Sequence, residues 1–368
     1  MEALFKPDGI NEEHRTKKKV FFILSSLTSG GSERVFWNMA QALDKRKFEV
    51  TIVLLSSKAN CYSSQLDQVR FIDLNTLKAS RSFFKLYALL NREKPYAVFS
   101  TTDHINILVA FVAKFLTIPR LIARASNIPE EQILHENLKS KFYMRFTRLS
   151  YGVYQQIICQ TEEMKQSLIS YYGIDSRKML VIPNPVVKTA EQRQTLSAKN
   201  KYHLIVVARF SPEKGLDRLV DILSALPAHY HLSFVGIGLL RKQIERKVKS
   251  LRLVDRVTFY GEIKNVLQVL TKHELMVLSS HTEGFPNVIL EALSVGLPVV
   301  TFKVSGVTGL IKNGFNGYVL PQNDIEGFKE KIIEACTQTR WDPVKIKQDV
   351  YQKYALQEIS KAYEKLLD

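Results

Sequence analysis

The chain has 368 residues, 45% of them hydrophobic, and is long enough to form two globular domains, each with its own core. Its cysteines, Cys61, Cys159 and Cys336, are far apart without a CxxC spacing, which argues against a disulfide framework or a zinc site and favours a reducing cytoplasm. The formal charge of +16 favours an anionic partner, and because no nucleic-acid-binding motif accompanies it, we expect a membrane surface or a phosphorylated substrate rather than nucleic acid.

Residues 1–16 are mixed and polar and lack the apolar core of a signal peptide, so they predict a flexible N-terminal tail. No later apolar run reaches the roughly 20 residues that a membrane-spanning helix needs. We therefore expect a protein that is soluble or bound peripherally to a membrane.

Apolar runs of strand length alternate with helical patterns along the chain, which predicts parallel sheets covered by helices on both faces. A Pro-Asn-Pro turn in VIPNPVV followed by a polar stretch predicts a linker at residues 186–200. The expected fold is α/β, with two doubly wound domains, residues 17–185 and 201–348, facing a central cleft, and a helix at residues 349–368 that packs on either domain. The expected strands are residues 19–25, 49–55, 97–100, 120–123 and 156–159, then 203–208, 231–235, 256–260, 275–279 and 297–301.

The loop after the first strand, in SSLTSGGSERVFWNMAQAL, is the first candidate ligand site. Gly30 and Gly31 allow a ligand to approach the backbone closely, and Ser32 can cap the following helix, whose N-terminal amides attract anions. An ordinary flexible turn before a capped helix would have the same sequence.

The second domain opens with a more specific pattern, VVARFSPEKG. Arg209 directly follows a strand and Lys214 lies at the head of a helix, so both cations can point into the cleft, as a diphosphate would require. The alternative is a pair of surface charges on a loop. In FVGIGLLRKQIE, Gly236 and Gly238 resemble the start of a dinucleotide fingerprint, but Arg241 replaces its third glycine, so a turn bordering the cleft is the better interpretation.

Two glutamates lie in the apolar segment EGFPNVILEALSVGLPVV. We expect Glu283 in the loop above a strand end and Glu291 about a turn and a half into the next helix, which Pro286 begins and whose first amides offer an anion site. A buried carboxylate needs partners, and sugar hydroxyls are suitable ones. A structural Glu291 that pairs with backbone groups or with a nearby cation remains the alternative.

In this order and spacing, the motifs GGSERV, RASNI, VIPNPV, ARFSPEKG, FVGIGLLRKQIE and E-x7-E resemble the retaining glycosyltransferases of family 4, which have the GT-B fold, over nearly the whole chain. The resemblance implies a nucleotide-sugar donor held mostly by the C-terminal domain, UDP being the most frequent nucleotide. It implies that Arg209 and Lys214 bind the diphosphate, that Glu291 binds the ribose and that Gly31 closes from the other domain. Glu283, expected to be catalytic together with Arg209 and Lys214, would hold the transferred sugar and phosphate with the backbone of Phe285, Pro286, Asn287 and Val288. Gly30 and Gly236 are further expected donor-binding residues.

For such an enzyme the resemblance implies front-face displacement with retention, in which the departing β-phosphate helps to take the acceptor proton. Because Arg209, Lys214 and a helix N-terminus stabilise that phosphate, we expect no metal and no other cofactor. Asp103 and His104, just past a strand of the first domain, are both candidates for contact with the donor sugar, the alternative being a loop pair in which Asp103 caps a helix. Gly309 stands where many relatives have a glutamate, so donor contacts there are in doubt.

The acceptor should bind the N-terminal domain, where ENLKSKFYMRFTRLSYGVY interleaves Lys139, Lys141, Arg145 and Arg148 with aromatic residues. This composition suits an anionic membrane, which predicts an enzyme on the inner face of a bacterial cytoplasmic membrane that extends a lipid-linked or saccharide acceptor for surface polysaccharide. A solvated helix with an aromatic core face would look the same. Two alternative functions remain: a sugar-nucleotide epimerase of similar fold, and a non-catalytic partner subunit, which would be expected to lose Arg209, Lys214 or Glu283.

Overall fold

The computed structural model describes residues 16–27, 30–57, 66–76, 79–126, 138–193 and 201–368, without the side chains at 79–80 and 138–143. Residues 1–15 of the predicted tail, residues 194–200 of the predicted linker and the side chains of Lys139 and Lys141 lie outside this description. Among the residues that it covers, no helix is long and apolar enough to cross a membrane.

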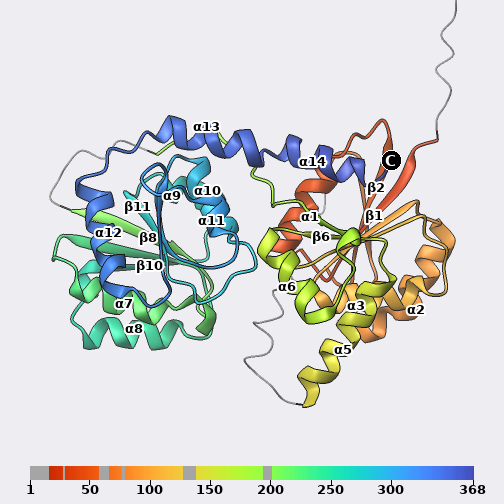
Figure 1. Cartoon of the computed structure of the whole chain (residues 1–368), viewed down its shortest axis with the longest axis horizontal. Helices are drawn as coiled ribbons and strands as arrows, with labels where there is room; N and C mark the ends of the chain where they lie inside the picture. The colour runs from red at the N-terminus through yellow and green to blue at the C-terminus, as the bar shows by residue number, and fades with distance from the viewer. Residues whose placement is uncertain (1–15, 28–29, 58–65, 77–78, 127–137, 194–200) are drawn as a thin grey trace, which may run out of the picture.

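The N-terminal domain is a parallel sheet between layers of helices (Figure 1), in the strand order β3-β2-β1-β4-β5-β6-β7. The order reverses between β1 and β4, so this is where loops diverge and leave room for a ligand. The strands are β1 (Lys18–Leu24), β2 (Phe48–Leu54), β3 (Val69–Asp73), β4 (Ala97–Thr101), β5 (Arg120–Arg124), β6 (Gln156–Cys159) and β7 (Met179–Val181). The helices are α1 (Gly31–Ala42), α2 (Ala79–Glu93), α3 (Asp103–Ala113), α5 (Leu138–Val153) and α6 (Glu162–Tyr172).

The C-terminal domain repeats this architecture with the strand order β10-β9-β8-β11-β12-β13, which reverses between β8 and β11. Its strands are β8 (Tyr202–Val207), β9 (Tyr230–Val235), β10 (Val257–Gly261), β11 (Leu275–Leu278), β12 (Val299–Phe302) and β13 (Gly317–Leu320). Its helices are α7 (Leu216–Ala225), α8 (Arg241–Ser250), α9 (Val266–Leu270), α10 (Asn287–Ser294), α11 (Val307–Leu310) and α12 (Ile325–Thr337), with a 3-10 turn η2 (Pro212–Lys214) after β8. The predicted fold class, two doubly wound parallel-sheet domains, is confirmed.

Three observed strands were not predicted, and all three lie at the edge of a sheet: β3 and β7 in the first domain and β13 in the second. β7 has only three residues, and β3 is partly exposed, with the sequence VRFID. Because β3 is covered less completely than a central strand, it does not need a continuous apolar run. β7 (MLV) and β13 (GYVL) are apolar but short.

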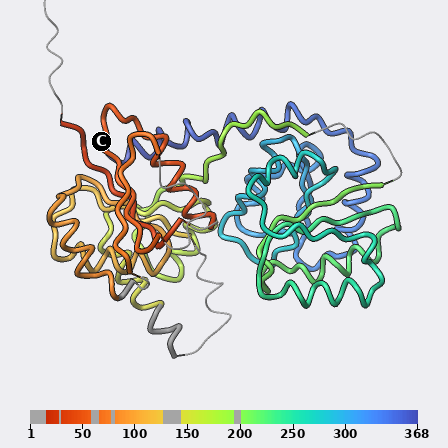
Figure 2. The backbone as a smooth tube through the Cα atoms, turned by 180° about the vertical axis from the view of Figure 1, so that it is seen from behind, coloured from red at the N-terminus to blue at the C-terminus, as the bar shows by residue number. Residues whose placement is uncertain are grey.

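The C-terminal segment forms two helices, α13 (Pro343–Tyr354) and α14 (Leu356–Lys365), rather than one helix over residues 349–368. α13 packs on α10 of the C-terminal domain, and α14 packs on α1 of the N-terminal domain, where Tyr363 and Leu367 join the core. The two helices run side by side with the chain that links the domains (Figures 1 and 2). Val186 and Ala355 form a β-bridge there, with the Val186 amide donating to Tyr354 at 2.7 Å. The chain therefore crosses between the domains twice at one place, and the two crossings are joined by this bridge.

Candidate active site

The two points at which strand order reverses face each other across the domain boundary, and most of the candidate residues follow the strands that end there. The amide nitrogen of Asn287 lies 3.4 Å from the carbonyl oxygen of Gly31, and a Cβ atom built on Gly31 would be only 2.6 Å from that nitrogen. Likewise a Cβ on Gly284 would lie 2.6 Å from the carbonyl oxygen of Ser126. Glycine at both positions therefore lets the two domains approach each other closely.

Lys214 and Glu283 form the most shielded ion pair of the cleft. The Lys214 ammonium lies 2.8 Å from each carboxylate oxygen of Glu283, and the two side chains are only 15% and 12% exposed. The Ser280 hydroxyl donates to the same carboxylate at 2.6 Å. Gly215 has a φ of +56° and passes so close to the Ser279 carbonyl that a Cβ would clash, which places η2 against the loop after β11. The two motifs of the sequence thus come together at one place.

Arg209 also follows β8, as predicted, but it differs from Lys214 because its side chain is 78% exposed. Its only ion-pair partner in the described part of the chain is Glu213, at 3.4 Å, and Glu213 also accepts a 2.5 Å hydrogen bond from Ser211. Such an exposed pair is weak. The guanidinium can therefore turn toward an anion without breaking a strong contact.

Glu291 lies on α10 with only 9% of its surface exposed, and it forms an ion pair with Arg34 on α1. The pair joins the two domains. This is the nearby-cation partner that the sequence left open as the alternative for Glu291. Arg34 was not predicted as a site residue, although it belongs to the GGSERV motif, one turn beyond Gly30.

Asp103 and His104, at the start of α3, differ in their exposure to solvent. Asp103 is buried, with the Tyr151 hydroxyl 3.4 Å away, whereas His104 is exposed. Partial desolvation lowers the pKa of His104 from 6.5, and the carboxylates of Asp103 and Glu33 oppose that shift. Between β4 and Asp103, Thr102 has a φ of +68°, a backbone conformation that costs about 1–3 kcal/mol in a residue other than glycine. Of the two candidates, His104 is therefore the one accessible to a ligand.

The other predicted donor-binding residues follow β9 and β11 of the C-terminal domain. Phe285, Pro286, Asn287 and Val288 lead into α10, whose first turn is closed by the Ile289 amide donating to Pro286. Gly236 has a φ of +135°, and a Cβ there would lie 2.1 Å from the Ala208 carbonyl, so the loop after β9 packs directly on the strand end that carries Arg209. This matches the predicted tight turn at the border of the cleft.

Arg124, at the end of β5, is buried below the glycine loop, with 2% of its surface exposed. It donates to Ser32 and Thr101, both at 3.2 Å, and to Asn184 at 2.6 Å, and Asn184 in turn donates to Asn287 at 2.7 Å. The Tyr363 hydroxyl of α14 is also a hydrogen-bond partner of Arg124; burial raises the pKa of Tyr363 to about 12 although Arg124 opposes the shift. Sequence reasoning noted the RASNI and VIPNPV motifs but assigned no role to Arg124 or Asn184.

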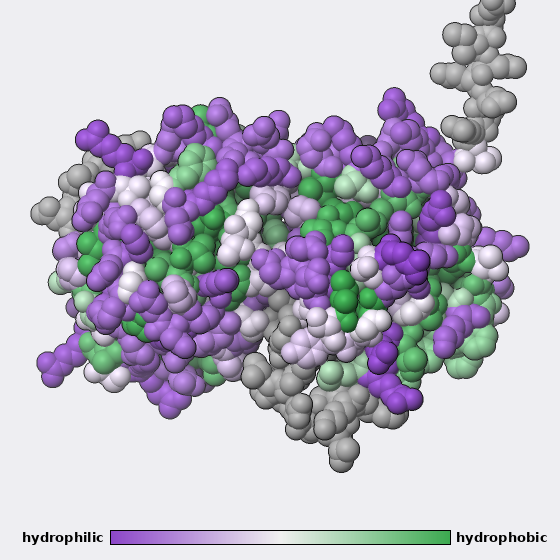
Figure 3. All heavy atoms as spheres, viewed as in Figure 1, coloured by the Kyte–Doolittle hydropathy of each residue, from purple (hydrophilic) through white to green (hydrophobic). Residues whose placement is uncertain are grey.

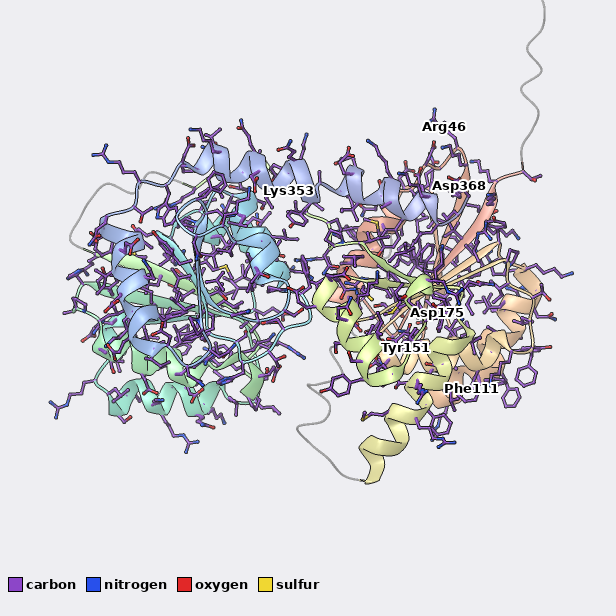
Figure 4. All side chains as sticks on the ribbon, in the orientation of Figure 1. Arg46, Phe111, Tyr151, Asp175, Lys353 and Asp368 are labelled. Atoms are coloured by element: carbon purple, nitrogen blue, oxygen red, sulfur yellow. The ribbon has the colours of Figure 1, made fainter. Side chains whose placement is uncertain are left out.

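The predicted membrane-binding helix, α5, shows both an exposed basic face and a buried aromatic face. Arg145, Arg148 and Leu149 are exposed, whereas Tyr151 is only 1% exposed and belongs to the core. Phe146 packs against Phe111 of α3 with ring centroids 6.0 Å apart. Figure 4 labels Tyr151 and Phe111 in the N-terminal domain. In the view of Figure 3, hydrophilic side chains cover most of the surface of both domains.

The residues that the structure describes contain no group of three or more His, Cys, Asp or Glu side chains placed to hold a metal ion. Gly309, in α11, is surrounded by open space, because a Cβ built there meets no atom within 4 Å. An acidic side chain would fit at that position.

Comparison with known proteins decides the family. Residues 187–355 match the family model described as Glycosyl transferases group 1, and residues 29–188 match Glycosyltransferase Family 4. The chain belongs to the family 4, group 1 glycosyltransferases. The predicted family and class of enzyme are thus confirmed.

Relatives of this glycosyltransferase span most of its length. It is 27% identical over 328 residues, covering 85% of the chain and 88% of the relative, to a protein of Campylobacter jejuni named GalNAc-alpha-(1->4)-GalNAc-alpha-(1->3)-diNAcBac-PP-undecaprenol alpha-1,4-N-acetyl-D-galactosaminyltransferase. It is 23% identical over 330 residues, 82% of the chain and 84% of the relative, to the Escherichia coli UDP-Gal:alpha-D-GlcNAc-diphosphoundecaprenol alpha-1,3-galactosyltransferase. The crystal structure of Anabaena Alr3699/HepE in complex with UDP has the same fold, with a TM-score of 0.77, 20% identity and coverage of 95% of this chain and 99% of that one.

Proposed function

We propose that this glycosyltransferase moves a sugar from a UDP-sugar to a lipid-linked saccharide acceptor, with retention of configuration, in the synthesis of a bacterial surface polysaccharide or lipopolysaccharide. Two relatives whose names specify undecaprenyl-diphosphate-linked acceptors, one of them with UDP-galactose as donor, support the choice of substrates. The observation that carries the proposal is the pair of facing strand-order reversals, with Lys214–Glu283 and Arg34–Glu291 placed between them.

The donor would lie along the cleft between these two ion pairs. Lys214, Arg209 and the first amides of α10 would bind the diphosphate, and Glu283 and Glu291 would accept hydrogen bonds from sugar and ribose hydroxyls. Arg34 contacts only one carboxylate oxygen of Glu291, which leaves the other available to a hydroxyl. Because Lys214 is shielded from water, its charge stabilises the departing phosphate more strongly than an exposed lysine would.

Retention would follow from attack on the face from which the diphosphate departs. In that geometry a β-phosphate oxygen takes the proton of the acceptor hydroxyl while the bond between the anomeric carbon and the phosphate oxygen breaks. Lys214 and Arg209 would neutralise the charge that develops on the phosphate, so the proposal requires no metal ion. His104, which is exposed at the start of α3, would contact a hydroxyl of the transferred sugar.

The lipid-linked acceptor would bring the N-terminal domain to the inner face of the cytoplasmic membrane. The exposed Arg145 and Arg148 of α5 are suited to anionic headgroups. Phe84 on α2 and Phe115 just after α3 are 80% and 66% exposed, and both rings contact Phe83. Because α2 and α5 both pack on α3, cationic and aromatic side chains occupy one side of this domain, as a peripheral membrane protein requires.

The test measures binding first and transfer second. Thermal unfolding of the purified protein is followed with UDP-, GDP- and ADP-sugars in EDTA, and the sugar that stabilises it is then offered with undecaprenyl-diphosphate-linked saccharides. We expect stabilisation by a UDP-sugar and a product whose new linkage has the anomeric configuration of the donor by NMR. Stabilisation by another nucleotide would correct the donor, an inverted linkage would overturn retention, and no stabilisation by any of the three would contradict the proposed donor site.

A further inference from the structure

Arg124 is a buried cation whose hydrogen-bond partners are all neutral, and the Glu33 carboxylate acts on it only from beyond ion-pair distance. Within the described residues its guanidinium has no carboxylate at ion-pair distance, and its Nε atom has no hydrogen-bond partner. Its other nitrogens donate to Ser32 and Thr101 and, most closely, to Asn184. Burying a charge in this way is costly, because neutral acceptors replace only part of its hydration. The cleft lies next to this group, since Ser32 and Asn184 both border it.

The chemistry of arginine fixes the orientation of the amides that follow. A guanidinium donates hydrogen bonds and cannot accept them, so Asn184 must turn its oxygen toward Arg124. The Asn184 nitrogen then faces the other domain and donates to the Asn287 oxygen at 2.7 Å. As a result the Asn287 nitrogen points toward Gly31 and the cleft, 3.4 Å from the Gly31 carbonyl. Neither amide can turn over without placing two oxygens or two N–H groups against each other.

We propose that Arg124 is a positioning residue, which acts through Asn184 to keep the Asn287 amide group presenting N–H donors to the sugar diphosphate. This inference rests on the proposed function. A reversed Asn287 would turn a carbonyl oxygen toward the phosphate and repel it, whereas the observed orientation offers a fixed donor at the N-terminus of α10, beside Lys214 and Glu283. The positive charge also polarises both amides in the direction that strengthens this donor.

If Arg124 only stabilised the fold, the orientation of Asn287 would not matter for transfer. Substitution of Asn184 distinguishes this structural role from the positioning role. Asn184→Asp keeps the shape of the side chain and gives Arg124 a carboxylate, so the fold should be as stable as before or more so. An aspartate cannot donate to Asn287, however, so Asn287 should turn over and present its oxygen to the cleft. Asn287→Asp removes the same donor directly while it still accepts from Asn184.

The experiment compares steady-state transfer by the full-length wild type, Asn184→Asp and Asn287→Asp, with unliganded thermal unfolding of each. For both variants we expect kcat to fall by about tenfold to 100-fold, because the lost donor acts on charge that develops in the transition state. The unfolding temperature of Asn184→Asp should not fall. The control is Gln155→Glu, which removes an amide donor to the Ile118 carbonyl at the opposite end of the N-terminal sheet and should leave kcat per folded molecule unchanged.

Arginine itself is tested by a conservative pair. Arg124→Lys keeps a group that donates hydrogen bonds and accepts none, so it should retain more activity than Arg124→Met. Methionine cannot fix the orientation of the Asn184 amide. If Asn184→Asp transfers sugar at the wild-type rate while Asn287→Asp is impaired, the proposal is overturned and Arg124 is structural. If the wild type binds no nucleotide sugar and transfers none, the proposed function fails, and this inference fails with it.

Discussion

The guanidinium of Arg34, on α1, contacts the carboxylate of Glu291, on α10, and so joins two domains through residues 257 positions apart in the chain. Glu291 is almost fully buried, and a buried carboxylate without a cation or several hydrogen bonds would be strongly disfavoured. The cation that stabilises it comes from the other domain. The approach of the two domains and the stabilisation of the Glu291 carboxylate are therefore coupled.

Replacement of Arg34 should measure that coupling. We expect Arg34→Met to lower the free energy of unfolding by about 1–2 kcal/mol, less than a fully buried pair because Arg34 is 35% exposed. The control is Arg46→Met, which breaks an ion pair with Asp44 whose arginine is 91% exposed and should change stability much less. Chemical denaturation gives both values. Equal losses of unfolding free energy at the two positions would show that the Arg34–Glu291 pair stabilises the fold no more than an exposed ion pair does.

Lys214 and Glu283 should be required for transfer but not for folding. Removing the shielded cation by Lys214→Ala takes away stabilisation of the departing phosphate, and we expect kcat to fall by about 10³-fold. Glu283→Gln should lower transfer as well, because an amide accepts fewer hydroxyls than a carboxylate. Lys247→Ala, which removes a peripheral pair with Asp221, is the matched control and should transfer normally. A folded Lys214→Ala variant with wild-type kcat would contradict the proposed donor site.

Gly31 should tolerate no side chain. In Gly31→Ala the new methyl group would lie 2.6 Å from the Asn287 amide nitrogen, so the domains must separate or Asn287 must move. We expect at least about a tenfold loss of kcat with little change in the unfolding temperature, since misplacement of donor groups by about 1 Å has large kinetic effects. Gly152→Ala, on α5, meets no atom within 4 Å and should be active. Normal transfer by Gly31→Ala would show that this approach of the domains is not needed.

The fold was predictable from sequence where burial is complete, and less so elsewhere. Central strands such as β1 and β8 contain continuous apolar runs, whereas the edge strand β3 mixes polar and apolar residues and β13 has only the four residues GYVL. The break at Ala355 between α13 and α14 has no clear signal. Lys214 and Glu283 were predicted together because each follows a central strand of one domain. Arg34 and Asn184 lie in motifs that were noticed, but their partners belong to the other domain, and one sequence does not reveal such pairings.

Stability should decline in mild acid because of His273. Its ring lies between the Val269 carbonyl and the Ser233 hydroxyl, and burial, with smaller contributions from His203 and Lys272, lowers its pKa to about 4 although the bond to Val269 opposes this. The unfolded chain binds a proton near the usual value of 6.5, so the neutral ring contributes fully above that pH, and stability is lost as pH falls toward 4. The difference corresponds to about 3 kcal/mol.

Denaturation at several pH values from 7 to about 4 checks this. His273→Gln should reduce the pH dependence over that interval, although other histidines with lowered pKa values, such as His231 and His281, will keep part of it. If the free energy of unfolding of His273→Gln depends on pH as steeply as that of the wild type, the acid sensitivity comes from those other histidines.

Membrane binding should depend on the charge of α5. Arg145→Glu combined with Arg148→Glu reverses two exposed cations, and we expect weaker binding to vesicles that contain anionic phospholipid, by roughly tenfold or more at low salt, since each basic residue near such a surface contributes about 1 kcal/mol. The wild type should itself dissociate from the vesicles as the salt concentration rises, because salt screens the attraction between its cations and the anionic headgroups. The control reverses Arg246 and Arg252, two exposed cations of the C-terminal domain. If both double variants lose binding equally, net charge rather than α5 holds the protein on the membrane, and if neither does, the basic face of α5 is not a membrane-binding surface.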